Sequence, residues 1–316
     1  MMARMRWLLG CALIAGCTVR GGPISCPSPL RPAARSQLTP VLVAATDQIY
    51  ALGGANDMHP IDDLWRWSFG SCGGWQPLSL ASSPGPRAGY AAAFDDKRQR
   101  ILYIGGSGAT QDVWALDTDR LIFTKLQAVG TPPPPAAVEL AAFDSLHDRV
   151  IYVGVETFAL DFTGSDQGQW RLVAGSSATA PASATVDPTR SLMLILDGAG
   201  LHGFAFYTGT WRDLTVVGDA PTAGARLAWD VTGARLLAIG DGVWAGALDA
   251  NGTAVAFTRL AISGAPPPRS DFAAVVSGDR VWLFGGANAR CSFDDVWQLS
   301  LSTNAWTNLE PATSCP

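Results

Sequence analysis

Charged residues are scarce in this chain. They make up 16% of its 316 residues, and the formal net charge is −5. No run of Lys or Arg occurs in the body of the chain. Nucleic acids and anionic membranes require concentrated positive charge in their protein partners, so the composition argues against both.

Histidine is also scarce, and the motifs of metal and nucleophile sites are missing. The three histidines, His59, His147 and His202, lie far apart in the chain. No His-x-His, Cys-x-x-Cys or His-Glu-x-x-His spacing occurs, and neither a nucleophile elbow nor a phosphate-binding glycine loop is present. We therefore expect no metal, no cofactor and no catalytic residue, and the pattern leans against an enzyme.

The sequence lacks a run of about 18 apolar residues, which a membrane-spanning helix would need. The apolar segment Trp7–Ala15 is shorter, and it follows Arg4 and Arg6, as in an export signal. It ends in Leu13-Ile14-Ala15-Gly16-Cys17, which resembles a bacterial lipobox. The chain is thus expected to be exported.

The lipobox resemblance implies cleavage after residue 16 and a lipid on Cys17. Thr18 follows rather than Asp, which implies an outer-membrane lipoprotein facing either the periplasm or the cell surface. An ordinary secretory signal with an incidental cysteine is the alternative. The membrane would then be a partner only through the lipid anchor.

Three regions follow from the composition. Residues 1–16 form the signal, and residues 17–40, which are rich in Pro, Gly and Ser, predict a tether. Residues 41–316 contain many turns, because 34 Gly and 21 Pro are spread over a chain that is 48% hydrophobic. This combination predicts an all-β fold of short strands.

A four-part pattern recurs along the third region. Its clearest copy, residues 269–309, has two apolar runs that end on Gly285-Gly286, then Asp295-Val296-Trp297, then Trp306-x-x-Leu309. The anchoring glycines of the six copies are Gly53, Gly105, Gly154, Gly198, Gly240 and Gly285. A period of this length with four strands per copy predicts a propeller.

The pattern is similar to the kelch repeat over about residues 41–310. Pro86-Arg87 and Pro268-Arg269 match the family's pattern, and Arg226 is a weaker match. The third to fifth copies lack the double glycine. The resemblance implies a six-bladed kelch-type β-propeller, with seven blades as the alternative.

Most recurring residues have a structural interpretation. The glycines permit close approach of strands, and the Trp residues fill space between blades. Four Asp–Arg pairs at the turns between first and second strands are expected to be weak, solvent-facing ion pairs, namely Asp95–Arg100, Asp144–Arg149, Asp187–Arg190 and Asp230–Arg235.

Four cysteines remain after the signal and the lipid site. In an exported protein they predict two disulfides, with three possible pairings. Cys291 and Cys315 fall on the same face of the expected propeller, whereas Cys72 falls on the other. We therefore expect Cys291–Cys315 and Cys26–Cys72, with free or mixed thiols as the alternative.

Two classes of function stay open. Some kelch proteins resemble galactose oxidase, but its copper ligands have no match here. The bacterial sialic-acid epimerases, another family branch, imply a sugar-modifying enzyme with its site in the central funnel. No residue of that site could be matched.

A binding module is the preferred hypothesis. Long loops after the second strands of the first and sixth copies should meet when the ring closes, and loops on a rigid scaffold often carry function. We expect this patch to bind a carbohydrate or protein partner at the cell envelope; freely varying loops and an envelope scaffold are the alternatives. Arg87 and Arg269 could instead tie neighbouring blades together. The candidate ligand-binding residues are Asn56, Asp57, His59, Arg87, Arg269, Asn288 and Arg290.

Overall fold

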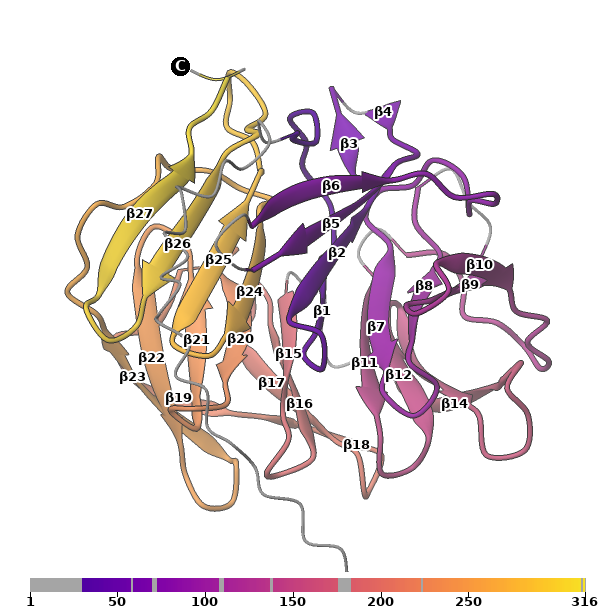
Figure 1. Ribbon diagram of the computed structural model, residues 1–316. Coiled ribbons are helices and arrows are strands. Elements are labelled where there is room, and N and C mark those ends of the chain that lie inside the picture. Colours follow the sequence, from indigo (N-terminus) through magenta and orange to yellow (C-terminus); the bar gives the residue numbers. More distant parts are fainter. Residues whose placement is uncertain are drawn as a thin grey trace, which may run out of the picture.

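The structure is a computed structural model that describes residues 30–57, 59–69, 73–107, 111–136, 139–175, 183–222, 224–313 and 315. These residues form strands, turns and loops. Figure 1 shows the strands gathered into sheets that surround a central axis. No helix in the described part of the chain is long and apolar enough to cross a membrane.

Six sheets form the blades, and each is continuous in sequence. Blade 1 contains β1 (Val41–Val43), β2 (Gln48–Leu52), β5 (Leu64–Ser68) and β6 (Gly74–Leu78), with the hairpin β3 (Ala55–Asn56) and β4 (His59–Pro60) above it. Blade 2 contains β7 (Ala91–Asp95), β8 (Arg100–Ile104), β9 (Val113–Asp117) and β10 (Ile122–Lys125). Blade 3 contains β11 (Leu140–Asp144), β12 (Arg149–Val153), β13 (Glu156–Asp161) and β14 (Gln169–Gly175).

The other half of the ring repeats this order. Blade 4 contains β15 (Ser183–Asp187), β16 (Leu192–Leu196), β17 (Leu201–Ala205) and β18 (Thr210–Asp213). Blade 5 contains β20 (Arg226–Asp230), β21 (Arg235–Ile239), β22 (Val243–Leu248) and β23 (Ala254–Arg259), and β19 (Thr215–Gly218) pairs in parallel with β23. Blade 6 contains β24 (Ala273–Ser277), β25 (Arg280–Phe284), β26 (Val296–Ser300) and β27 (Ala305–Glu310).

The prediction of a six-bladed all-β propeller is confirmed, and the seven-bladed alternative is wrong. Within each blade the four main strands pair antiparallel in chain order. The first strands β1, β7, β11, β15, β20 and β24 contact one another around the axis. Loops between second and third strands lie on one face, at the top of Figure 1, which we call the loop face. The turns between the other strands lie on the opposite turn face.

The hydrophobic core lies between the blades rather than within one sheet. Between blades 2 and 3, Leu102 and Val113 pack with Tyr152 and Trp170, all nearly fully buried. Between blades 6 and 1, Trp67, Trp75 and Phe284 meet at ring-centroid distances of 5.0–6.0 Å. Edge-to-face contacts of this kind add to the area that aromatic residues bury.

The double glycines allow close backbone approach between blades. Gly53 and Gly285 have φ values of 58°, a conformation that favours glycine. A Cβ on Gly53 would lie 2.5 Å from the carbonyl oxygen of Arg87, and one on Gly285 would lie 2.6 Å from that of Arg35. Each glycine therefore sits where the chain leading into the next blade crosses.

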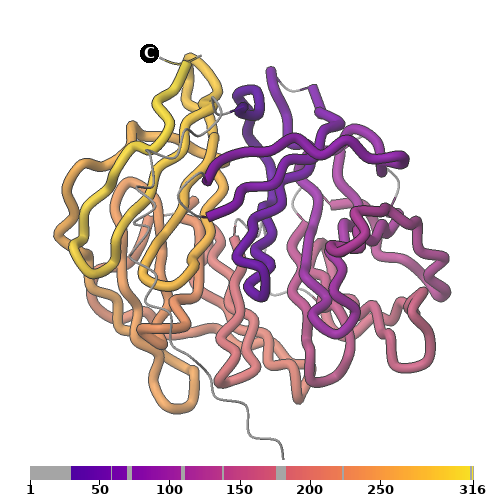
Figure 2. The backbone as a smooth tube through the Cα atoms, viewed as in Figure 1, coloured from indigo at the N-terminus to yellow at the C-terminus, as the bar shows by residue number. Residues whose placement is uncertain are grey.

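Residues 30–40, which the sequence assigns to a tether, are packed into the ring. They run along the junction between blades 6 and 1 to the start of β1. Residues 79–90 run in the same way between blades 1 and 2 to the start of β7. Arg35 is 3% exposed, and its backbone bonds Phe293 and Gly286 of blade 6. Figure 2 shows this first described segment beside the last blade. We call it the closing connector, because it stands where a covalent connection from blade 6 to blade 1 would lie.

The sequence analysis expected the Asp–Arg pairs of the turn face to be exposed to solvent, and this prediction is wrong. The side chains of Asp95 and Asp187 are fully buried. Those of Asp144 and Asp230 are 2% and 3% exposed. These carboxylates are buried because three of the paired arginines extend over them into the next blade. The resulting interblade bonds are Arg100 to the carbonyl of Asp166, Arg149 to that of Phe206, and Arg190 to that of Asp249.

Candidate functional site

The two long loops of blades 1 and 6 form one continuous surface on the loop face. Ser36 of the closing connector exchanges two backbone hydrogen bonds of 2.9 Å with Ala55 on β3. On its other side, Arg35 N donates to the carbonyl of Phe293 in the blade 6 loop at 3.2 Å. The loops therefore flank the closing connector, which the sequence analysis did not include in this patch.

Five of the predicted residues lie on this surface, which we call the closure surface: Asn56, Asp57, His59, Asn288 and Arg290. Asp57, His59, Asn288 and Arg290 are exposed, and Asn56 is half-buried. Their loops have defined shapes. His59 Nδ1 lies 2.9 Å from the carbonyl of Asp57, and Asn288 Oδ1 accepts from the backbone N–H of Arg290 at 2.8 Å.

Arg87 and Arg269 do not lie at the rim of this surface. Their side chains are only 1% and 2% exposed. Arg269 donates to both carboxylate oxygens of Asp295, at 2.5 and 2.8 Å, and to the carbonyl of Gly285 at 2.9 Å. The guanidinium also stacks on Phe293 at 3.8 Å from its ring centroid. A buried, bidentate guanidinium has a structural role, as the alternative interpretation proposed.

Arg35 makes the same contacts in blade 1, and the sequence analysis missed it. It donates to both oxygens of Asp63 and to the carbonyl of Gly53. The signal was the tripeptide Arg35-Ser36-Gln37, which parallels Arg87-Ala88-Gly89 and Arg269-Ser270-Asp271. Each third residue has a φ between 51° and 66°. We call Arg35, Arg87 and Arg269 the connector arginines.

Each acidic partner of a connector arginine also binds a tryptophan. Trp65, Trp114 and Trp297 donate their Nε1–H to Asp63, Asp112 and Asp295 at 2.7–2.8 Å. The Asp and Trp of the recurring pattern therefore form one hydrogen-bonded unit with the connector arginine. Trp75 and Trp306 are buried between blades as predicted, whereas these three indoles are half-buried.

The closing connector and the segment after β27 are fastened beside the closure surface. Cys291 and Cys315 form a disulfide across 24 residues, the pairing that the sequence predicts. Thr313 N donates to Asp294 at 2.8 Å, and Arg31 donates to the carbonyl of Pro311 at 2.7 Å. Cys17, Cys26 and Cys72 lie outside the described residues, so the lipid site and the second pairing stay predictions.

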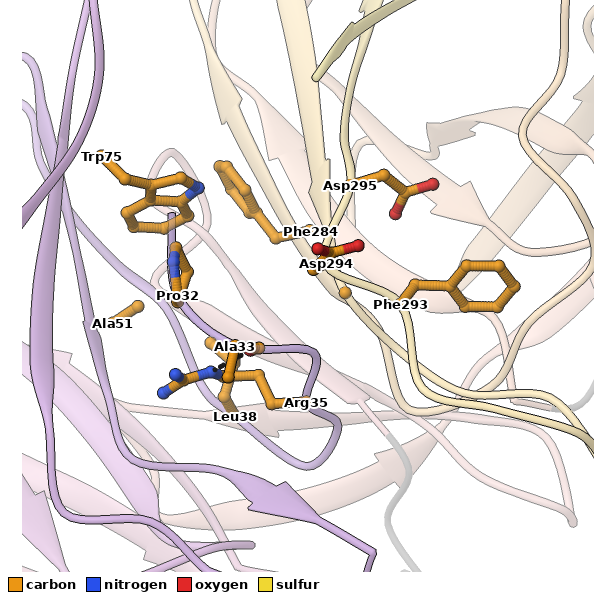
Figure 3. A pocket seen from close by; sticks show the side chains of 11 residues that line it. Pro32, Ala33, Arg35, Leu38, Ala51, Trp75, Phe284, Phe293, Asp294 and Asp295 are labelled. Atoms are coloured by element: carbon orange, nitrogen blue, oxygen red, sulfur yellow. Dashed lines mark hydrogen bonds between the residues drawn. The ribbon is translucent and has the colours of Figure 1, made fainter. Parts of the chain in front are cut away.

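Among the described residues, the space beneath the closure surface is small. The space between blades 6 and 1, drawn in Figure 3, holds about 20 Å³, enough for about one water molecule. Pro32, Ala33 and Arg35 of the closing connector line it together with Trp75 and Phe284. The closing connector therefore largely fills the space between blades 6 and 1.

One part of the central channel has an almost entirely apolar lining. Its space of about 340 Å³ is lined by the first strands of blades 1 to 4, including Leu42, Ala92, Phe94 and Phe143. Thr185 is the polar side chain among its lining residues, and none of them titrates in the ordinary pH range. An epimerase-like reaction would require titratable groups in this funnel.

His147 lies on the turn face, and His59 and His202 lie on the loop side. His202 is 6% exposed and lies between carboxylates, with Nδ1 2.7 Å from Asp213 and Nε2 3.0 Å from Asp197. Among the residues that the structure describes, no group of three or more His, Cys, Asp or Glu could hold a metal ion.

Comparisons with known proteins agree with this architecture. Residues 268–313, which span blade 6, match the kelch motif. The solved "Structure of YjhT" is similar, with a TM-score of 0.63 and 13% identity over 89% of this chain and 99% of that one.

A curated relative is similar over a shorter stretch. The flagellar outer-arm dynein alpha chain of Chlamydomonas reinhardtii is 28% identical over 123 residues, which cover 34% of this chain and 3% of that protein. The chain therefore spans only a small part of this relative's length. From its sheets, its last blade and these likenesses, the chain is a six-bladed β-propeller that carries a kelch motif.

Proposed function

We propose that this propeller is a recognition module of the bacterial cell envelope, which binds a carbohydrate or protein partner through the closure surface. The observation that carries the proposal is the junction of blades 6 and 1. Two long loops are fixed there on both sides of the closing connector, with Asp57 and Arg290 exposed on either side. Loops on a rigid scaffold are suited to binding.

The chemistry of the surface supports a polar, macromolecular partner. Asp57 and Arg290 supply opposite charges, while Asn56, Asn288 and His59 supply hydrogen-bond donors and acceptors. The loop geometry is fixed before binding by hydrogen bonds within each loop and by the nearby disulfide. Preorganised loops reduce the entropy that association must overcome.

The envelope location rests on the lipobox-like segment at residues 13–17, which lies outside the described residues. In this proposal the protein is an outer-membrane lipoprotein, held by a lipid on Cys17. Metabolic labelling with palmitate tests it. Label should enter the wild-type protein and be lost in Cys17→Ala; equal labelling of both would remove the lipid anchor from the proposal.

The alternative is a sugar-modifying enzyme with its site in the funnel, and the described channel wall gives it little support. The part of the channel lined by the first strands of blades 1 to 4 carries no titratable side chain, whereas such a reaction needs a general acid and a general base. Turnover of a bound sugar would nevertheless favour the enzyme.

Thermal unfolding against a ligand panel tests the binding proposal. A ligand at about 100 times its dissociation constant adds about 2.7 kcal/mol to the free energy of unfolding. The panel contains simple sugars, sialic acids and peptidoglycan fragments. The stabilisation should be lost in Asp57→Ala/Arg290→Ala, which removes exposed groups.

The matched control is Asp119→Ala/Arg120→Ala. These residues are exposed in the β9–β10 turn of the opposite face, and the substitutions change the same kinds of charge. The control should keep the full stabilisation. If it loses the stabilisation while the closure-surface variant keeps it, the binding site lies on the turn face and the proposal is wrong.

A further inference from the structure

The junction between blades 2 and 3 contains an open groove where the corresponding space between blades 6 and 1 is filled. Gln111 and Asp112 precede β9 as Asp294 and Asp295 precede β26, and Trp170 on β14 corresponds to Trp75 on β6. The space at the 6–1 junction holds about 20 Å³, and the groove at the 2–3 junction holds about 310 Å³. We call the latter the joint groove.

The groove has a cause in the sequence. The connector into blade 3 carries Pro135-Ala136 four residues before its first strand, where the connectors into blades 2 and 6 carry Pro86-Arg87 and Pro268-Arg269. Gly54 and Gly286 donate their backbone N–H to the carbonyls of Arg87 and Arg35. Gly106 donates instead to the carboxylate of Glu139, at 3.0 Å. At the 2–3 junction the Glu139 carboxylate thus replaces the arginine carbonyl as the hydrogen-bond acceptor of the glycine. No described side chain of the connector replaces the arginine side chain itself.

The floor and rim of the joint groove differ in polarity. Val113, Leu126 and Trp170 form an apolar floor, and each is at most 6% exposed. Asp112 and Lys125 lie at the rim, with Lys125 Nζ 3.4 Å from the Asp112 carboxylate and 48% of its side chain exposed. A pocket of a few hundred cubic ångströms with convergent polar groups is typical of small-ligand sites.

The polar groups offer both acceptors and donors. Asp112 is fixed by Trp114 and Arg87, at 2.8 and 3.4 Å, so its carboxylate is oriented before a ligand arrives. Lys125 supplies N–H donors on the other side. Vicinal hydroxyls, which both donate and accept, match this arrangement, and the C–H face of a sugar ring matches the floor.

We infer that the joint groove binds a saccharide unit, with its hydroxyls between Asp112 and Lys125 and its ring over Val113, Leu126 and Trp170. This deepens the proposed function, because it names the ligand class and a second binding position. The groove lies away from the closure surface, so variants can separate the two.

The chain has two lysines, Lys97 and Lys125, which makes a direct test possible. Full-length protein is treated with an amine-acylating reagent with and without glucose, galactose, N-acetylglucosamine, N-acetylneuraminic acid or the peptidoglycan disaccharide. Mass spectrometry then measures acylation at each lysine. A bound saccharide at about ten times its dissociation constant should reduce acylation of Lys125 about tenfold and leave Lys97 unchanged.

Thermal unfolding with the same saccharides supplies the matched variants. Lys125→Met keeps the apolar part of the side chain but removes the donor, and it should lose the stabilisation; Lys97→Met should keep it. If the closure-surface variant loses the stabilisation and Lys125→Met keeps it, this inference is wrong while the proposed function holds. If no saccharide protects Lys125 or stabilises the protein, the inference is wrong and the closure surface is left to protein partners.

Discussion

The ring is held together differently in its two halves. At the junctions of blades 5–6, 6–1 and 1–2, a connector arginine with at most 4% of its side chain exposed binds an Asp and a glycine carbonyl on the loop face. At the junctions of blades 2–3, 3–4 and 4–5, an arginine of a turn-face pair binds a carbonyl of the next blade. Each junction thus has at least one largely buried guanidinium, which lies on the loop face at the first three junctions and on the turn face at the other three.

This difference explains why the weaker sequence repeats still form regular blades. Blades 3 to 5 lack the double glycine and the connector arginine, but blades 2 to 4 supply buried turn-face pairs that replace the lost contact. The connectors into blades 3 to 5 carry no such arginine, and the joint groove opens at the first of these junctions. The space at the junction of blades 6 and 1 is therefore filled, whereas the space at the junction of blades 2 and 3 is open.

The largest effect should follow from breaking a connector arginine. Arg269→Ala leaves the carboxylate of Asp295, which is 3% exposed, without its charged partner. Breaking one partner of a buried ion pair costs about 3–5 kcal/mol. Denaturant unfolding should show this loss, and the exposed Arg290→Ala should be neutral within about 0.5 kcal/mol. Equal stability of both variants would contradict the structural role of Arg269.

The disulfide should come next, because it strengthens only the closing half. Cys291 and Cys315 enclose 24 residues, and loop-closure entropy for that length corresponds to about 3 kcal/mol. Cys291→Ser/Cys315→Ser should lose this amount in denaturant unfolding, and reduced wild-type protein should match it if no other disulfide forms. A peptide map without reductant that links Cys291 elsewhere would remove the basis of the prediction.

A turn-face pair should have a smaller effect than a connector arginine. Arg149→Ala removes bonds to Asp144 and to the carbonyl of Phe206, but His147 Nδ1 stays 2.7 Å from Asp144. We expect a loss of about 2 kcal/mol, typical of a hydrogen bond to a charged group. Arg120→Ala, on an exposed turn of the same face, is the control and should change little. A loss as large as that of Arg269→Ala would erase the contrast between the halves.

The smallest effect concerns acid stability at the 2–3 junction. The Arg98 guanidinium, which bonds both oxygens of Asp148 at 2.7 and 2.9 Å, holds the pKa of that carboxyl below its usual value. A lowered pKa in the folded state adds stability above about pH 4, and this is lost as the pH falls through the folded-state value. Asp148→Asn should therefore flatten the acid limb of the stability profile, by about 1 kcal/mol or less. An unchanged limb would show that the pair adds nothing.

Local patterns predicted much of the fold. The double glycines, the Asp-Val-Trp segments and the spacing of the anchors were sufficient for six blades, and strand alternation placed Cys291 and Cys315 on one face. Arg35 was missed because Pro-rich connectors have the composition of a tether, although the following Ser36 and Gln37 repeat the pattern of other connectors. The burial of Asp95 and Asp144 depends on arginines that reach the next blade, which no window of the sequence displays.

The candidate site was predicted less completely than the fold. Asp57 and Arg290 are exposed as expected, because loop residues without apolar periodicity rarely enter a core. From the sequence, Arg87 and Arg269 could lie either at the rim of the binding surface or in a buried ion pair. The positions of Asp112 and Asp295 in the structure show that both arginines form buried ion pairs. The joint groove was not predicted, because a missing arginine in the connector into blade 3 does not by itself show whether other side chains fill the space, and the connectors into blades 4 and 5 lack the arginine too.

The most direct test of the binding account is a single thermal-unfolding series on four proteins with the saccharide and peptidoglycan panel. They are the wild type, Asp57→Ala/Arg290→Ala, Lys125→Met and Asp119→Ala/Arg120→Ala. The account predicts that a ligand stabilises the wild type and the turn-face variant but fails to stabilise at least one of the two loop-face variants. Stabilisation that only the turn-face variant loses would contradict it.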